Sequence, residues 1–288
     1  MKAAVTKALP ADLIVRVPVT IVDNDGGQLY IPVTNLPLFI QRRALKNPVF
    51  ATQLQRAMLE KQFAPLSLLL YFDEAQAGNI LSPDLTKKLL LGYVAIAELG
   101  LLQLETSWMD LCAFSHNSVH DVTGGWSKVF KEVVLALDNF GMEAGFPCPV
   151  PGHEPFWLRL KITCVTGDLD SLRCFYDWKG SGSIKMCLVC KNVVSQSSGL
   201  AAYDSSLVDV ADPDFSKCAL WSNEELEQVW DKPATNPSTT NKGRKHEEKA
   251  AGFNIYNREG LLADNKSRRL TPVTSVFLIQ CMVTTAMG

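Results

Sequence analysis

The chain has 288 residues, of which 47% are hydrophobic and 20% charged, enough apolar material for one large globular domain or two smaller ones. Its formal net charge of −2 and pI near 6.1 exclude a broadly basic protein that coats nucleic acid, so any contact with DNA has to be local. No stretch approaches the roughly 18 to 20 consecutive apolar residues of a membrane span, and the N-terminus lacks the apolar core of a signal peptide. We therefore expect a soluble, intracellular protein, nuclear or cytoplasmic, without a membrane partner.

Residues 1–64 are expected to form an N-terminal hairpin followed by helices. Residues 14–22 and 28–33 alternate between apolar and polar side chains around a glycine-rich loop, a pattern typical of a β-hairpin. Residues 37–63 carry apolar side chains at helical spacing with mixed charges between them. Pro65 is expected to end this helical segment.

Residues 65–194 contain the strongest apolar segments and are expected to form the core domain. The order strand, strand, strand, helix, strand is predicted in turn by residues 67–72, 87–99, 101–114, 126–140 and 156–166. The helix has the clearest signal, because its apolar side chains form one stripe at a period of 3.6 residues.

Residues 195–288 are more polar and are expected to form an insertion and an irregular C-terminal region. One short helical piece is predicted at residues 222–231, and several prolines interrupt the remainder. The charged run at residues 241–249 is interpreted as a solvated surface, with a nucleic-acid contact as the alternative.

Two aspartates follow apolar runs within the core segment. Asp73 comes directly after residues 67–72, and Asp168 follows the predicted strand at residues 156–166. The order of elements is that of ribonuclease H-like folds, in which the first and fourth strands are parallel neighbours whose ends meet. The fold class predicted is thus α/β, a ribonuclease H-like mixed sheet flanked by helices, with a cysteine-containing insertion.

Asp73 and Asp168 are accordingly predicted as catalytic, metal-binding residues. Mg²⁺ and Mn²⁺ prefer carboxylate oxygens, and two such ions about 4 Å apart support phosphoryl transfer. The alternative is that Asp73 begins a turn and Asp168 caps the next helix, which is common for aspartate. No phosphate-binding glycine loop, nucleophile elbow or dinucleotide fingerprint is present, so a nucleotide cofactor is not expected.

Cys187 and Cys190 form a Cys-x-x-Cys pair whose spacing suits two ligands of one Zn²⁺. A structural zinc site needs four ligands, and Cys218 is the candidate for the third, followed by His246 or His153. Free thiols are the alternative interpretation, because no second Cys-x-x-Cys follows. The other cysteines are too sparse for a disulfide scaffold.

Two segments resemble motifs of CACTA-type (Plavaka-like) transposases. Residues 66–100, LSLLLYFDEAQAGNILSPDLTKKLLLGYVAIAELG, resemble the stretch around the first catalytic aspartate of that family. Residues 167–194, GDLDSLRCFYDWKGSGSIKMCLVCKNVV, resemble the segment of the second aspartate, with its Cys-x-x-Cys. Overall, residues 65–275 are similar to transposon-derived proteins of dinoflagellate genomes, which also carry a segment like residues 248–262.

The resemblance implies a ribonuclease H-like DDE core, DNA as substrate, and metal-dependent strand cleavage and transfer by Asp73 and Asp168. The family needs a third acid, and its members carry a Tyr-Asp-x-Met-His-like segment just after the position of Ser275. Here residues 276–288 read VFLIQCMVTTAMG, without an acid or a histidine. We therefore expect a transposon-derived protein that is either a DDE-type DNA transposase or a degenerate remnant, which keeps the fold and has lost the reaction with the third acid. A non-catalytic, zinc-stabilised module that binds DNA or protein is the alternative, and an ordinary structural domain is a third.

Overall fold

The structure is a computed structural model that divides into two compact units, Met1–Asp168 and Leu169–Gly288. The predicted three-part division, 1–64, 65–194 and 195–288, stays a prediction. The residues described are 11–21, 27–76, 88–100, 102, 107–119, 121–211, 214–235, 237–238, 240–271 and 273.

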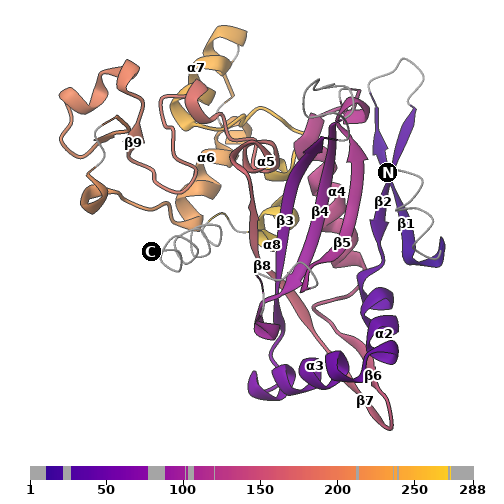
Figure 1. Ribbon diagram of the computed structural model, residues 1–288. Coiled ribbons are helices and arrows are strands. Elements are labelled where there is room, and N and C mark those ends of the chain that lie inside the picture. The colour runs from indigo at the N-terminus through magenta and orange to yellow at the C-terminus, as the bar shows by residue number, and fades with distance from the viewer. Residues whose placement is uncertain are drawn as a thin grey trace. The chain divides into compact units, whose positions relative to one another are not determined.

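The first unit is built on a mixed, curled six-stranded sheet (Figure 1). Across the sheet the strand order is β1-β2-β5-β4-β3-β8. Neighbouring strands are antiparallel except β3 and β8, which run parallel. The strands are β1 (Ile14–Thr20), β2 (Gln28–Thr34), β3 (Leu66–Gln76), β4 (Lys88–Ile96), β5 (Met109–Ser115) and β8 (Leu160–Gly167). The α/β class and the placement of the last strand beside the first core strand are therefore confirmed.

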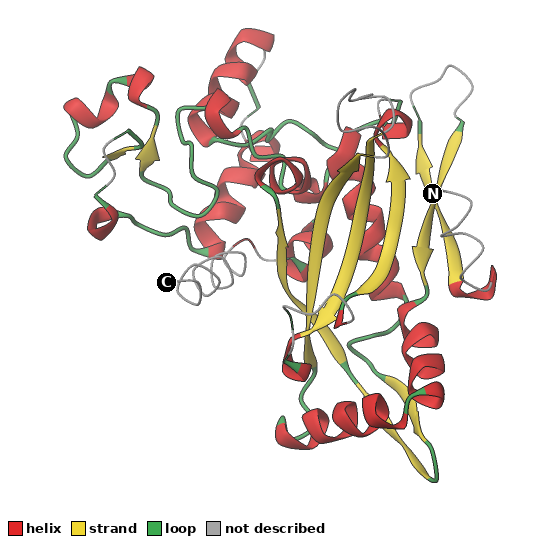
Figure 2. Cartoon of the chain, viewed as in Figure 1, coloured by secondary structure: helices red, strands yellow, loops and turns green. Residues whose placement is uncertain are grey.

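Helix α4 (Gly125–Asn139) covers one face of the sheet (Figure 2). Its buried side chains recur at helical spacing, as predicted, and the Phe130 ring packs edge-on against Phe72 of β3 with the ring centroids 4.7 Å apart. Phe130 also contacts Phe114 of β5, at 6.4 Å. The aromatic rings therefore join the helix to β3 and β5, the strands on either side of β4.

Two further helices, α2 (Leu36–Lys46) and α3 (Pro48–Glu60), occupy the segment predicted to be helical. They are separate because the Pro48 nitrogen has no hydrogen to donate to the preceding helix, whereas proline suits the first turn of a new helix. The Asn47 side chain caps α3 by accepting a hydrogen bond from the Phe50 amide at 3.1 Å. The helical segment ends at Glu60, before the predicted stop at Pro65.

The segment at residues 156–166 does not form the single strand that its alternation predicts. It is divided between β7 (His153–Leu158) and β8, with Arg159 between them. Strand β7 pairs with β6 (Phe146–Val150) in a hairpin, whereas Leu160 begins the pairing with Leu66 of β3. Alternation continues across the break, so the pattern alone gives no sign of a change of partner.

The second unit contains short elements: α5 (Leu169–Phe175), the two-stranded parallel pair β9 (Val193–Val194) and β10 (Val208–Asp209), α6 (Asn223–Thr235), α7 (Asn241–Ala251) and α8 (Asn265–Leu270). Helix α6 confirms the predicted helical piece. The charged run forms most of α7, which Gly252 ends in a left-handed conformation at φ 87°. The Trp230 and Phe253 rings meet edge-on, 5.9 Å apart, in the core of this unit.

Within the described part of the chain, no helix has both the length and the hydropathy that crossing a membrane demands.

Candidate functional site

Asp73 and Asp168 follow the last paired residues of two neighbouring parallel strands. Phe72 of β3 is the register partner of Gly167, the last residue of β8. Asp73 is the next residue of β3, and Asp168 is the first residue after β8. Adjacent strands are about 4.8 Å apart, and residues opposite each other project from the same face. The register therefore brings the two aspartates together at one place in the first unit.

The backbone also decides which face Asp73 occupies. Successive residues of a strand project from opposite faces of the sheet, so Asp73 projects from the same face as Tyr71. Phe72 projects from the other face, where it packs under α4. One expectation about Asp73 is wrong: β3 does not end there but continues to Gln76. The extension forms because β4 keeps pairing with β3 after the β8 pairing has ended.

Tyr71 lies within the electrostatic field of both aspartates. Its pKa is raised from the ordinary 10.0, first by burial, then by the charges of Asp73 and Asp168, and by a hydrogen bond that the phenol donates to Asp73. The burial comes from rings on the same side of the sheet: Trp108 lies 5.6 Å and Tyr93 6.3 Å from the Tyr71 ring, centroid to centroid. Tyr71 thus lies near both carboxylates.

The donor set suits a hard divalent cation. Asp73 is partly exposed and Asp168 is exposed, so a hydrated ion has access to both carboxylates. Mg²⁺ is commonly held by one or two protein carboxylates, with water and substrate phosphate completing its shell. Among the described residues, no group of three or more His, Cys, Asp or Glu side chains is arranged to hold a metal ion. The pair therefore fits a partial site that a ligand or solvent would complete.

Sequence reasoning missed Tyr71. The signal was present, since Tyr71 is two residues before Asp73 and a strand repeats its face every two residues. Nothing in the sequence indicated that the rings of Tyr93 on β4 and of Trp108, directly before β5, would partly bury this phenol.

The second unit brings the three predicted zinc-ligand cysteines together. Cys190 is buried with Val193 and Val208, and Cys187 and Cys218 pack against this cluster. The Cys190 amide donates a hydrogen bond to the Cys187 sulfur at 3.2 Å. Burial, followed by the neighbouring thiols, raises the pKa of Cys190 to about 12.

The two histidines considered as a fourth ligand are placed on other elements. His246 is exposed on α7, and His153 begins β7 in the first unit. None of Cys187, Cys190 and Cys218 is in a disulfide bond. They are neighbours, but they are not in the geometry of a formed metal site.

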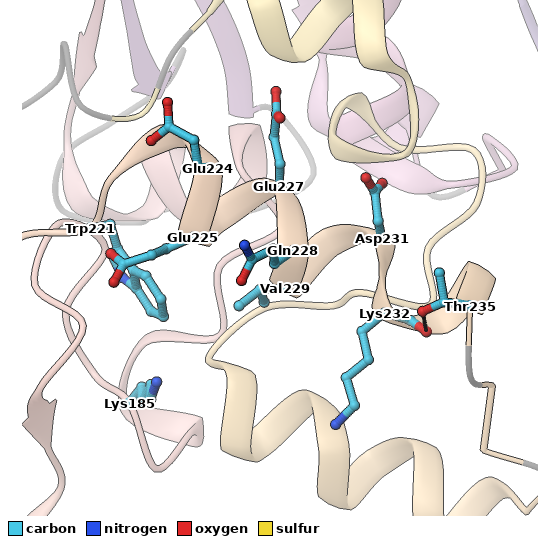
Figure 3. Close-up of a pocket in the computed structure, with 10 residues that line it drawn as sticks. All are labelled: Lys185, Trp221, Glu224, Glu225, Glu227, Gln228, Val229, Asp231, Lys232 and Thr235. Carbon is cyan, nitrogen blue, oxygen red and sulfur yellow. Dashed lines mark hydrogen bonds between the residues drawn. The ribbon is translucent and has the colours of Figure 1, made fainter.

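A wide groove of about 740 Å³ follows α6 in the second unit (Figure 3). Figure 3 shows Glu224, Glu227 and Asp231 pointing to one side of the helix and Lys232 pointing to the other. At one end, the Lys185 ammonium lies 4.6 Å from the centre of the Trp221 ring. The groove contains none of the residues that the sequence predicted as catalytic or metal-binding. Its carboxylates lie on an open, solvated face of the helix.

A scan of the chain against protein-family models and a search of the curated proteins both found no match.

Proposed function

We propose that this chain is a transposon-derived protein with a ribonuclease H-like core, in which Asp73 and Asp168 bind Mg²⁺ or Mn²⁺ and, through it, a DNA phosphate. The observation that carries the proposal is the parallel pairing of β3 with β8, which puts the two predicted acids one residue beyond the same register pair. The strand order β5-β4-β3-β8, with α4 between β5 and β8 in the chain, supports the fold assignment.

The residues of the site have separable roles under this proposal. Asp73 and Asp168 would hold the cation, which supplies Lewis-acid chemistry at a phosphoryl oxygen when bound. Tyr71 fixes the Asp73 carboxylate by donating a hydrogen bond to it. The exposed position of Asp168 leaves room for a DNA backbone to approach from solvent.

The same site argues for binding without cleavage. A DDE-type reaction uses three acids, and the described residues supply no third metal-binding side chain beside the pair. We therefore expect the chain to bind DNA in a cation-dependent way and to leave its strands uncut.

The test is calorimetric titration of the full chain with Mn²⁺. We expect saturable binding to the native protein, weakened roughly tenfold or more by Asp73→Asn or Asp168→Asn, since even the residues behind a ligand affect metal affinity by that factor. Both substitutions keep the side-chain shape, so the melting temperature shows whether the variant remains folded.

Asp170→Asn is the matched control. Asp170 is exposed, lies two residues after Asp168 and pairs with Arg173 at 3.0 Å, so this change removes an equal charge close by. Unchanged affinity in Asp73→Asn and Asp168→Asn, or an equal loss in Asp170→Asn, would show that the pair is not a metal site.

The convergence of Cys187, Cys190 and Cys218 favours a second candidate, a zinc-stabilised binding module. A Cys-x-x-Cys turn whose amide already points at the first sulfur is prepared for a cation, and a modest approach of Cys218 would add a third thiolate. Stoichiometric zinc in the purified protein, lost in Cys190→Ser, would support this candidate. Metal-free protein of normal stability would count against it.

A further inference from the structure

A small, partly enclosed cavity of about 140 Å³ lies in the second unit, between the second half of α6 and the segment that leads into α8. On this measure one water needs roughly 10–15 Å³, so the cavity can hold a small polyatomic ion with several waters. Its wall is rich in hydrogen-bond donors. The polar side chains of the wall include those of Trp230, Asp231, Asn254, Arg258, Asn265 and Arg268.

Arg268 is the unusual member of this wall. Its side chain is only 4% exposed, and a guanidinium group stays protonated at every physiological pH. One nitrogen, Nη2, donates to Asp231 at 2.9 Å. The other two, Nε and Nη1, are buried and have no hydrogen-bond partner among the described residues. Those two nitrogens carry most of the N–H donors of the group.

Trp230 presents a second donor of the same kind. The residue is buried, and its indole N–H has no partner within the described part of the chain. The Arg268 guanidinium carbon lies 5.7 Å from the centre of the Trp230 ring, so the two side chains are neighbours. Leaving a buried donor unpaired is costly, and a cluster of such donors beside one cavity indicates a missing acceptor.

The charge of the wall has the sign that an anion needs. Arg258 and Arg268 contribute two positive charges, and Asp231 contributes one negative charge. The Asp231 side chain is 54% exposed and is therefore screened by solvent, whereas Arg268 is buried and is not. Its single bond to Asp231 leaves most of the guanidinium without an acceptor.

We propose that this cavity binds a phosphate-type oxyanion through Arg268, Arg258 and the Trp230 indole. A tetrahedral oxyanion offers several acceptors in a small volume, which matches donors arriving from separate side chains. The unpaired nitrogens are closed to solvent in the free protein, so a small rotation of the Arg268 and Trp230 side chains accompanies binding. The ligand is either free inorganic phosphate or a backbone phosphate of nucleic acid. Its site includes neither Asp73 nor Asp168.

The experiment is a calorimetric titration of the full chain with sodium phosphate, at an ionic strength held constant with sodium chloride. We expect saturable binding that chloride does not reproduce. Arg258→Gln and Trp230→Phe should each weaken it, Arg258→Gln by roughly tenfold, which is the value of one charge-assisted hydrogen bond. Arg258 is exposed, so its change is not expected to unfold the protein. Trp230→Phe removes part of a buried ring, so its melting temperature shows whether that variant remains folded.

Arg269→Gln is the matched control, because Arg269 is the exposed neighbour of Arg268 and does not line the cavity. It should keep full phosphate affinity. Phosphate also stabilises proteins non-specifically by exclusion from their surfaces, an effect that all variants would share. Absence of saturable binding, or an equal loss in Arg269→Gln, would overturn the proposal.

A short DNA duplex added at the same ionic strength distinguishes the two sources of the anion. If the ligand is a backbone phosphate, DNA should compete with inorganic phosphate, and Arg258→Gln should weaken both. If the ligand is free phosphate, DNA should leave the phosphate affinity unchanged. Asp73→Asn should bind phosphate normally in either case, so failure of the metal-binding proposal would not affect this result.

Discussion

Tyr71 is the residue whose ionisation reports on the acid pair. Its phenol is partly buried, donates to Asp73 and lies in the field of both carboxylates, and each of these effects favours the neutral form. Removing either negative charge should therefore lower the pKa of Tyr71 toward its ordinary value. The same side chain that positions Asp73 thus serves as an internal probe of how close the carboxylates are.

We predict that Asp73→Asn and Asp168→Asn each lower the pKa of Tyr71, measured by tyrosinate absorbance in an alkaline titration. Subtracting the titration of a Tyr71→Phe variant isolates the signal from the other tyrosines. If Asp168→Asn leaves the Tyr71 titration unchanged, the second carboxylate is not beside the first.

The raised pKa also has a consequence for stability. The folded chain holds the Tyr71 proton more tightly than the unfolded chain does, so this contribution to stability is complete below about pH 10 and is lost as the pH rises through the folded-state value. Tyr71→Phe cannot ionise, so its stability should fall less steeply above that pH.

At the scale of residues, the sequence identified Asp73 and Asp168 as candidates but not the Tyr71 side chain beside them, and their metal binding stays a prediction. Asp73 and Asp168 could be found because each follows an apolar run, and polar residues at strand ends have a recognisable context. The meeting of Trp230 and Arg268 could not, because it joins two short helices without a periodic signal linking them.

Among the elements, β4 shows how one small residue permits the core packing of the sheet. Gly92 lies between Phe72 on β3 and Cys112 on β5, the register partners on either side. A Cβ atom at Gly92 would lie 2.6 Å from the Cys112 sulfur and 2.8 Å from the Phe72 ring, closer than real contacts allow. The glycine therefore gives the Phe72 ring room to pack under α4.

We predict that Gly92→Ala lowers the free energy of unfolding by about 1–3 kcal/mol, the usual cost of overpacking a core. Urea unfolding measures this, and Cys112→Ala in the same chain should recover part of the loss by removing the nearest atom. Gly182→Ala is the control, because nothing lies within 4 Å of its added Cβ. Equal effects at Gly92 and Gly182 would mean that close packing at β4 is not the cause.

Helices and strands were predicted correctly where a segment forms one element and that element alone. Strands β3, β4 and β5 were identified as apolar runs of strand length, and consecutive residues of β3 such as Leu68 and Leu69 are buried on both faces. Helix α4 was identified by its single buried stripe. The division of residues 156–166 was missed because β7 and β8 alternate in phase while pairing with different strands. The strand β6 was missed because its prolines and neighbouring glycines are typical of a loop.

For the molecule as a whole, the near-neutral charge restricts the DNA binding that we propose. With a formal net charge of −2, the chain has no general attraction for a polyanion, and binding must come from local positive charge. A divalent cation held by Asp73 and Asp168 would neutralise the two carboxylates and offer a Lewis acid to a phosphate oxygen. DNA binding at Asp73 and Asp168 should therefore depend on the divalent cation and be lost when a chelator removes it.

The most direct test of the metal-binding claim is the anomalous diffraction of Mn²⁺ in crystals of the full chain. We predict a peak within bonding distance of both carboxylates, Asp73 and Asp168, with the Tyr71 phenol donating to Asp73. Carboxylates on opposite faces of the sheet, or Mn²⁺ bound only at other residues, would contradict the claim.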